Sequence, residues 1–397
     1  MRRSLASVLV AVFATAAAQT PPPPTPPTID ELRSLPYAAP GKPAEGKTGV
    51  ITNSRFAQPG YNFYGDRFNN RATLLTNDGA TLRTWSRPNS SSWGHVELLP
   101  SGELLVIECW DALKKDRYPN EKGFESRIVK LAPDSHVEWT SHIPAHHDIQ
   151  VLADGSFLTL TERRRQIDAV DKTQLTIDNG IALLAGNGSL MKEKSLYQIL
   201  ERSRKVTFKS VKPDERGLVD LFHTNSIQRF SALKSLPPGP MYDRNNILFC
   251  SRHQDLIGII SEKGRLLWSW GQKELSGPHS ARLLPNGDIL VFDNGLGRKA
   301  SRIVEVDPRT DRIVWTYQPE RAEDFYSATG GYCQHLPNGN VLVTDSWQYS
   351  AFEVTPERRV VWRFVSPEKS FVYRMDRYAF DFFTPRFRQS WPSVPPR

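Results

Sequence analysis

Three histidines stand at related places in a repeated sequence pattern. His147 and His279 each lie eight residues before a turn glycine, Gly155 and Gly287, at the start of an expected innermost strand. His223 begins the corresponding strand of a further repeat. A neutral imidazole is a competent nucleophile, base or metal ligand near neutral pH. We therefore expect the three side chains to converge at one end of a central channel.

Two further polar residues belong to the same expected pocket. Asn225 lies two residues after His223, and Arg252 follows the second strand of the same repeat. A guanidinium presents a planar fork of donors that suits a tetrahedral oxyanion. With His147 and His279 these residues would form a cationic pocket rich in hydrogen-bond donors.

Two other repeats lack a histidine at the equivalent position. Gly94 and Gly331 stand eight residues before the turn glycines of those repeats. His95 is one residue out of register, and a one-residue slip moves a side chain to the other strand face. His95 is therefore expected to point away from the pocket.

Three converging histidines are also a possible metal site, since imidazole is a ligand for zinc and other transition metals. Arg252 argues against a metal, because a fixed cation beside a dication is repulsive unless an anionic substrate lies between them. We predict neither a metal nor another cofactor. A metal-dependent hydrolase or lyase that uses these histidines stays open as an alternative.

Two short motifs define the elements that must position these residues. One is a hairpin whose turn contains a glycine, and such turns suit the positive φ angles of tight hairpins. Its four clear copies, separated by 53, 132 and 52 residues, are centred on Gly102, Gly155, Gly287 and Gly339. The other motif is a polar turn followed by a strand that ends in tryptophan, as at Trp85, Trp139, Trp268, Trp315 and Trp362.

The spacing of these motifs decides the architecture. Trp268, Trp315 and Trp362 are 47 residues apart, and Trp85 and Trp139 are 54 apart. Two hairpins in roughly 50 residues make four antiparallel strands, which is a propeller blade. A stack of sandwich domains would not normally keep so constant a period. We predict an all-β fold, a six-bladed β-propeller of four-stranded antiparallel blades.

The repeats divide the chain into six units at about 49–92, 93–145, 146–215, 216–275, 276–328 and 329–367. The third unit lacks the tryptophan and carries a charged insertion at 163–172, and the fourth is interrupted by an insertion at 231–244. The repeated tryptophans are expected to pack between blades.

The N-terminus predicts export. Arg2 and Arg3 precede the apolar run Leu5–Ala14 and the small residues Ala16–Ala18, which is the layout of a secretory signal peptide. We expect a signal peptide at 1–18, a Pro-rich tether at 19–48, the propeller at 49–380 and a C-terminal tail at 381–397. The expected location is periplasmic or secreted, with no membrane span after signal cleavage.

The net charge of +8 is a mild basic excess. It is compatible with anionic substrates, and without a concentrated basic stripe it does not favour nucleic acid as a partner. The three cysteines are Cys109, Cys250 and Cys333, so one disulfide is possible in an oxidising compartment. Neither the pairing nor the oligomeric state can be deduced from the sequence.

Several motifs together resemble bacterial aryl-sulfate sulfotransferases. The resemblance runs from about residue 50 to residue 380. It rests on the segments His147–Gln150, Phe222–Ile227, Ser251–Gln254, Gly277–Gly287, Phe292–Gly295 and Val372–Arg374. Four of these motifs in the right order make a fairly specific pattern, and the family is a six-bladed propeller, which agrees with the blade count.

The resemblance implies a PAPS-independent ping-pong reaction between a small phenolic sulfate donor and a phenol acceptor. His279 would attack sulfur and form a sulfohistidine, and the acceptor would then take the sulfuryl group. His279, His223 and Arg252 would be catalytic residues, with His147 and Asn225 binding the substrate. Candidates to stack on the aromatic ring are Tyr61, Tyr64, Trp93, Trp110 and Tyr326.

This sequence departs from the family's pattern, and other functions stay open. The well-known members carry an extra N-terminal sandwich domain for which this chain has no room. Residues 306–315 are also similar to the repeat of quinone-dependent dehydrogenases, but no adjacent cysteine pair accompanies them. A propeller that binds a ligand or partner without catalysis is the remaining alternative, because fold alone does not determine function.

Overall fold

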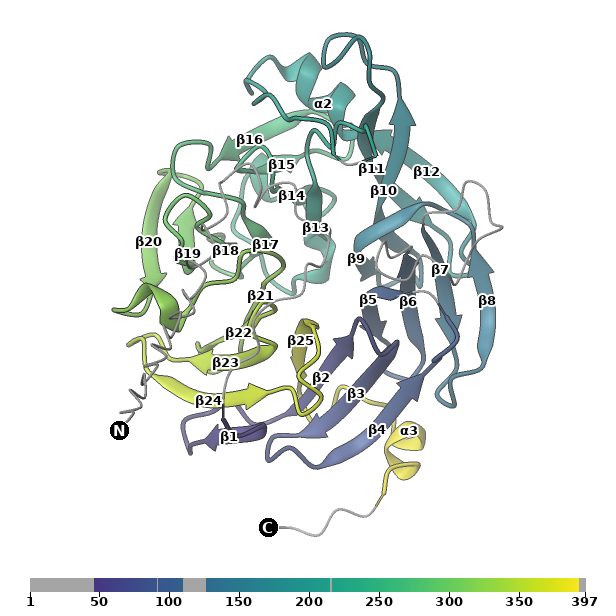
Figure 1. Ribbon diagram of the computed structural model, residues 1–397, viewed down its shortest axis with the longest axis vertical. Helices are drawn as coiled ribbons and strands as arrows, with labels where there is room; N and C mark the ends of the chain where they lie inside the picture. Colours follow the sequence, from purple (N-terminus) through teal and green to yellow (C-terminus); the bar gives the residue numbers. More distant parts are fainter. Residues whose placement is uncertain (1–45, 91, 110–125, 215, 393–397) are drawn as a thin grey trace, which may run out of the picture.

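The computed structural model describes residues 46–90, 92–109, 126–214 and 216–392. The predicted signal peptide, most of the predicted tether and Trp110 lie outside the described residues. Within the described part, six antiparallel sheets surround a central axis (Figure 1). Five sheets have four strands and one has five. The prediction of an all-β, six-bladed propeller is confirmed.

The first three blades, each given from the axis to the rim, cover the N-terminal half of the ring. Blade one contains β25 (Val372–Tyr378), β2 (Tyr61–Asp66), β3 (Arg71–Thr76) and β4 (Thr81–Ser86). Blade two contains β5 (Ser92–Leu98), β6 (Leu104–Cys109), β7 (Ser126–Leu131) and β8 (Val137–Ser141). Blade three contains β9 (Ala145–Val151), β10 (Phe157–Arg165), β11 (Thr176–Leu184) and β12 (Leu190–Ser195).

The other three blades complete the ring. Blade four contains β13 (Thr224–Arg229), β14 (Ile247–Ser251), β15 (Leu256–Ile260) and β16 (Leu266–Trp270). Blade five contains β17 (His279–Leu283), β18 (Ile289–Asp293), β19 (Arg302–Asp307) and β20 (Arg312–Tyr317). Blade six contains β21 (Tyr332–His335), β22 (Val341–Asp345), β23 (Ser350–Val354), β24 (Val360–Val365) and the rim strand β1 (Gly49–Asn53).

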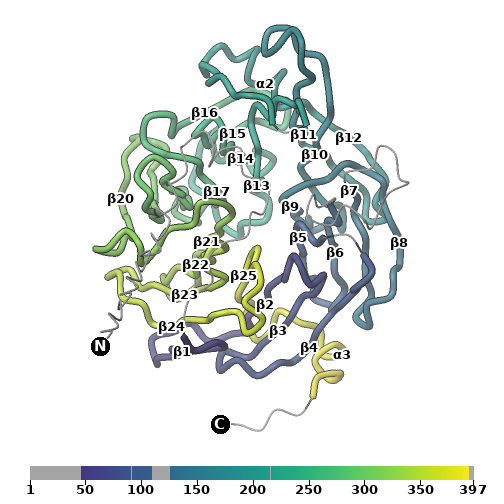
Figure 2. The backbone as a smooth tube through the Cα atoms, in the orientation of Figure 1, coloured from purple at the N-terminus to yellow at the C-terminus, as the bar shows by residue number. Residues whose placement is uncertain are grey.

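The two ends of the propeller exchange strands across the ring closure. β1 pairs with β24 on the rim of blade six, and β25 supplies the innermost strand of blade one (Figure 2). The predicted first unit, 49–92, and last unit, 329–367, were therefore wrong at their outer boundaries. Motif counting assigns each strand to the unit that is next to it in the sequence. The open edge of a sheet, however, can pair with a strand from the other end of the chain. The closing strand lies beyond the last repeat and has no turn motif to identify it.

The repeated tryptophans hold adjacent blades together. The indole nitrogen of Trp85 donates to the Gly102 carbonyl of blade two at 3.0 Å, and that of Trp362 donates to the Asn77 carbonyl of blade one at 2.9 Å. Trp268 and Trp315 reach the next blade in the same way, through Asp311 Oδ1 and the Pro356 carbonyl. Trp85 and Trp362 are fully buried, so the same side chains also fill the space between blades.

Glutamine side chains join neighbouring inner strands near the axis. Gln150 of β9 accepts from the Arg229 amide at 2.6 Å and donates to the Arg229 carbonyl at 3.2 Å. Gln334 of β21 makes the same two bonds with Arg377 of β25, at 2.7 and 3.0 Å. Gln228 accepts from the Leu283 amide at 2.6 Å. Neighbouring inner strands belong to different sheets and do not form backbone hydrogen bonds with each other at these places. The glutamine side-chain amides supply hydrogen-bond partners for the buried peptide groups instead.

In the described part of the chain, helices are few and lie outside the blades. They are α2 (Leu196–Ser203), α3 (Pro385–Gln389) and the short 3-10 helices η2 (Phe230–Ala232), η3 (Pro240–Tyr242) and η4 (Ala322–Asp324). Among the described residues, no helix has the length and apolar character needed to cross a membrane. All three cysteines lie among the described residues; none of them forms a disulfide in this structure, and two are buried.

Part of the segment predicted as a C-terminal tail packs on blade one. Phe383 and Phe387 are 1% and 4% exposed and join the core formed by Trp85 and its neighbours. The Trp85 and Phe387 ring centroids lie 6.0 Å apart. Phe387 also lies against Gly102, so close that no side chain would fit on that glycine. Helix α3 therefore covers the tryptophan that joins blades one and two.

We expect Phe387→Ala to lower the free energy of unfolding by about 3–5 kcal/mol, because it removes a buried aromatic ring and leaves a cavity. Denaturant unfolding of the full chain measures the loss. Phe380→Ala is the matched control, since Phe380 is 52% exposed and its loss should cost less than about 1 kcal/mol. Equal losses in the two variants would contradict the structural role of α3.

Candidate active site

A polar cavity lies on the propeller axis, where the first residues of the inner strands meet. Its volume is about 300 Å³ when the open solvent at its mouth is included. The lining residues come from every blade: His95, His147, Asp148, Asn225, Ser226, His279, Ser280, Arg282, Gly330, Gly331, Tyr332, Tyr373 and Arg374.

A backbone hydrogen bond repeats between the strands and shows which lining residues are equivalent. Asp148, Ser226 and Ser280 each accept, through the side chain, from a backbone amide of the next inner strand. The residues immediately before them, His147, Asn225 and His279, are therefore equivalent to one another. His147 and His279 occupy the position predicted from the glycine spacing. In blade four that position belongs to Asn225, and His223 lies two residues earlier, just before β13.

A β-bulge explains why two successive residues of a strand both line the cavity. The register shifts at the start of β5, β9, β13 and β17, and also within β25. A bulge inserts an extra residue and turns the local side chains, so strict alternation fails there. His147 and Ser280 adopt positive φ angles of 62° and 53° at these places.

The prediction that His95 points away from the cavity was wrong for this reason. The shift between Trp93 and His95 leaves Gly94 as the extra residue. His95 then occupies the position equivalent to Asp148 and Ser226 and lines the cavity, with 1% of its surface exposed. Nothing in the local sequence distinguishes a bulged strand from a regular one, so counting residues could not find His95.

His279 has the geometry of an oriented, neutral imidazole. Its Nδ1 lies 2.8 Å from Asn294 Oδ1 and 3.3 Å from the Gly277 carbonyl, so Nδ1 carries the proton. Asn294 is itself held, since its amide donates to the carbonyls of Ser327 and Gly330. No residue in the described part of the chain hydrogen-bonds Nε2 of His279. Burial, followed by the charge of Arg252, lowers the pKa of His279 to about 3.

His147 is part of a row of imidazoles. Its Nδ1 lies 2.5 Å from Nδ1 of His146, so one ring donates and the other accepts. The ring centroids of His147 and His223 are 4.8 Å apart, as are those of His223 and His253. Burial is the main cause that lowers the pKa of His147 far below its usual value and brings those of His146 and His253 to about 3.

His223 and Arg252 lie beside the cavity and are not among its lining residues. Nδ1 of His223 lies 2.5 Å from Asp220 Oδ2, which orients the ring. Arg252 is 1% exposed and donates from Nη1 to His253 Nε2 at 3.0 Å. Both residues lower the pKa of His279 through their charge, after burial, so both lie near it. The structure thus brings the other four predicted site residues together around His279.

Asp220, His223 and His253 also form a group with metal-ligand chemistry, with ligand atoms within 4.8 Å of one another. The three residues are already joined by hydrogen bonds. His253 Nδ1 contacts the Asp220 carbonyl at 2.6 Å, and its other ring nitrogen accepts from Arg252. A metal would have to displace these bonds and sit beside a guanidinium, so the group fits a hydrogen-bonded network better than a metal centre.

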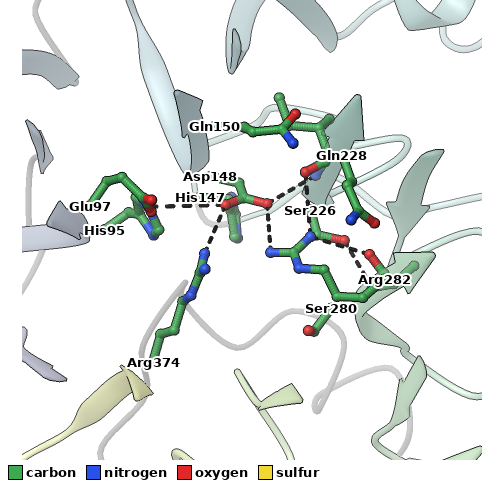
Figure 3. Close-up of polar contacts among 12 residues, drawn as sticks. His95, Glu97, His147, Asp148, Gln150, Ser226, Gln228, Ser280, Arg282 and Arg374 are labelled. Atoms are coloured by element: carbon green, nitrogen blue, oxygen red, sulfur yellow. Dashed lines mark hydrogen bonds and ion pairs between the residues drawn. The ribbon is translucent and has the colours of Figure 1, made fainter. Parts of the chain in front are cut away.

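The floor of the cavity centres on the carboxylate of Asp148 (Figure 3). Asp148 Oδ2 accepts from Arg282 Nη2 and the Ile227 amide, both at 3.0 Å. Its Oδ1 accepts from Arg374 Nη1 at 3.2 Å. Burial alone would raise the pKa of Asp148, but the two guanidinium groups and His95 outweigh it, and the pKa is lowered. These partners belong to four different blades.

The aromatic residues proposed for substrate stacking are mostly structural. Tyr61 packs on Phe380 and Trp391, Tyr64 is buried against Phe364, and Trp93 is buried and donates to Ser90. Tyr326 is the exception. It is half-buried and, like Trp347, packs on Leu296 and Ala328; burial raises the pKa of its hydroxyl and the charge of Arg252 opposes this rise, so Tyr326 lies near the site. Tyr332 and Tyr373 line the cavity and were missed by the sequence analysis.

The sequence matches the family described as arylsulfotransferase (ASST) over residues 123–367, which is more than half of the chain. A search among curated proteins finds no match.

Solved structures resemble this chain in fold alone. A protein of unknown function from Bacteroides caccae is 16% identical over 80% of this chain and 98% of its own, with a TM-score of 0.52. A streptogramin B lyase is 13% identical over 84% of this chain and 86% of its own, with a TM-score of 0.45. A virginiamycin B lyase from Staphylococcus aureus, with quinupristin, is 10% identical over 82% of this chain and 90% of its own, with a TM-score of 0.45.

We expect Asp148→Asn to lower the free energy of unfolding by about 3–5 kcal/mol near neutral pH, because it removes the carboxylate that pairs with the buried Arg282 and one of the two carboxylates that pair with Arg374. The pKa of Asp148 is lower in the folded state than in the unfolded state. The ionised carboxylate therefore contributes to the stability of the fold above its unfolded-state pKa, and this contribution disappears as the pH falls through its folded-state pKa.

The difference in the free energy of unfolding between wild type and Asp148→Asn should therefore be constant from about pH 7 to pH 5 and become smaller below about pH 4. Urea unfolding at each pH measures it. Asp154→Asn, at an exposed turn of the same blade, is the matched control and should unfold like wild type. A difference that grows towards acid pH would overturn the assigned role.

Proposed function

Because this chain belongs to the arylsulfotransferase family, we propose that it moves a sulfuryl group from a phenolic sulfate ester to a phenol, without PAPS, through a sulfohistidine at His279. The geometry of His279 is the observation that carries the proposal. Its Nδ1 proton is committed to Asn294, and the imidazole is neutral at physiological pH. The lone pair is therefore on Nε2, and His279 lines the cavity.

In the first half-reaction the Nε2 lone pair forms the N–S bond while the S–O bond to the donor breaks, and the phenolate leaves with the electron pair. In the second half-reaction the acceptor oxygen forms a new S–O bond. The N–S bond then breaks, and its electron pair returns to Nε2. A phenolate is a tolerable leaving group, and splitting the transfer into two steps keeps each barrier low.

The other predicted residues surround the transferred group in this proposal. Arg252 supplies a fixed positive charge for the sulfuryl oxygens in a buried setting, where it acts more strongly than in water. His147 and Asn225 flank the cavity as substrate-binding groups, and the Asn225 amide is oriented by its bond to the Pro278 carbonyl at 2.8 Å. His223, whose ring is held by Asp220, is the remaining catalytic group and would act as a hydrogen-bond donor towards the sulfuryl oxygens.

The alternatives have less support. A metal-dependent hydrolase or lyase would need the Asp220, His223 and His253 group to exchange its internal hydrogen bonds for an ion. A propeller that only binds a partner would not need an oriented neutral histidine beside a buried guanidinium. Export to the periplasm or the medium is part of the proposal and rests on residues 1–18 alone.

His279→Ala should abolish acceptor-stimulated release of 4-nitrophenol from 4-nitrophenyl sulfate, with a loss of at least about a thousandfold in kcat. Mass spectrometry of the wild-type enzyme, quenched with donor but without acceptor, should find one sulfuryl group on the peptide that contains His279. His136→Gln, a surface histidine in the same chain, is the matched control and should retain full activity. Labelling elsewhere, with activity kept in His279→Ala, would refute the nucleophile.

The rate of the donor half-reaction should also be insensitive to acid over an unusual range. The lowered pKa of His279, about 3, keeps the imidazole neutral where an ordinary histidine would be protonated. We expect kcat/KM for the donor to stay constant between about pH 7 and pH 5. Stopped-flow release of nitrophenol measures it. An acid limb centred near pH 6.5 would show that the nucleophile is a histidine of ordinary pKa.

A further inference from the structure

The proposed reaction leaves the proton of the acceptor phenol without an assigned base, and the floor of the cavity offers one. We propose that His95 binds the acceptor hydroxyl and removes its proton in the second half-reaction. This inference rests on the proposed function and adds a catalytic residue from blade two that is not among the residues implied by the family resemblance.

The first observation is that His95 is buried with an unsatisfied ring nitrogen. His95 is 1% exposed and lines the cavity, and within the described part of the chain its Nε2 has no hydrogen-bond partner. Leaving a buried polar group unsatisfied costs about 1–3 kcal/mol, so a histidine placed only for packing normally has partners. Asn225 Oδ1, on the wall of the same cavity, is also buried without a partner. Both atoms belong to residues that line the cavity.

The second observation is the pair of carboxylates beside the ring. His95 Nε2 lies 3.5 Å from Glu97 Oε2 and 4.0 Å from Asp148 Oδ1 (Figure 3). Neither contact has hydrogen-bond geometry, but both place negative charge where a protonated imidazole would need it. Arg282 and Arg374 compensate Asp148 and limit this charge. Among the described residues, His95 is the basic side chain that lies within 4.0 Å of the Glu97 carboxylate.

The third observation is that the other histidines near the cavity are less suited to act as the base. His279 is the nucleophile, and burial lowers the pKa of His147 and His146 so far that neither readily takes up a proton. His223 already shares its Nδ1 with Asp220 and lies outside the cavity lining. His95 is thus the histidine of the lining, apart from the nucleophile, that has acidic neighbours to stabilise an imidazolium.

The step balances with the groups present. The acceptor O–H bond breaks and its proton goes to the His95 imidazole, while the oxygen lone pair forms the S–O bond and the N–S bond to His279 breaks. The imidazolium of His95 then returns the proton to solvent or to the phenolate that leaves in the next donor half-reaction. No oxidant, metal or further reactant is required.

His95→Gln separates this role from a structural one, because the two half-reactions can be measured apart. Release of nitrophenol in the first turnover reports the donor step, and we expect it to stay within about twofold of wild type. Transfer from the sulfo-enzyme to phenol should fall by about a hundredfold, the usual size of a lost general base. Transfer to 4-cyanophenol at about pH 9, where this acceptor is already ionised and phenol is not, should fall less than about threefold.

The matched control is His335→Gln, which changes an exposed histidine on the inner strand β21 and should leave both half-reactions unchanged. Equal losses with phenol and 4-cyanophenol, or a slow first turnover, would overturn the role of His95 as a base. A wild-type enzyme that forms no sulfo-enzyme at all would instead refute the proposed function. The two failures are therefore distinguishable.

Discussion

The buried carboxylate of Asp148 is the interaction on which the rest of the site depends. Removing an ion of this kind from water costs several kcal/mol unless well-placed partners compensate it. Its partners are two guanidinium groups and a backbone amide, contributed by β17, β25 and β13. Arg374 belongs to the strand that closes the ring, so the charge of Asp148 is fully compensated only when the propeller is closed. Ring closure and assembly of the cavity floor are consequently one event.

This arrangement also sets the electrostatics of the cavity. Arg282 and Arg374 compensate the negative charge of Asp148, so this charge acts less strongly on the histidines of the cavity. Burial then keeps His147 and His279 neutral, and Arg252 remains as the cation near His279. An uncharged nucleophile beside a fixed positive charge suits an anionic ester, since the substrate is attracted while the lone pair stays available.

The blades provide the rigidity that such a site requires. Each tryptophan that reaches a turn of the next blade fixes the spacing between sheets, and the glutamines do the same between inner strands. Catalytic groups must be held within a fraction of an ångström, so they are best placed on elements that cannot slide independently. The bulges at the strand starts then turn two residues per strand towards the axis without breaking the blades.

The sequence by itself determined the repeat, the blade count and the position of His147 and His279, because hairpin turns and strand periods are local and a glycine turn sets the register of the strand before it. Only the tertiary structure decided which strands close the ring, that bulges turn His95 inward, that Asn225 and not His223 is equivalent to His279, and that Asp148 is the hub. The residues that bind Asp148 lie up to 226 positions away in the chain. Contacts at that distance follow from how the blades pack, and no local pattern of residues encodes them.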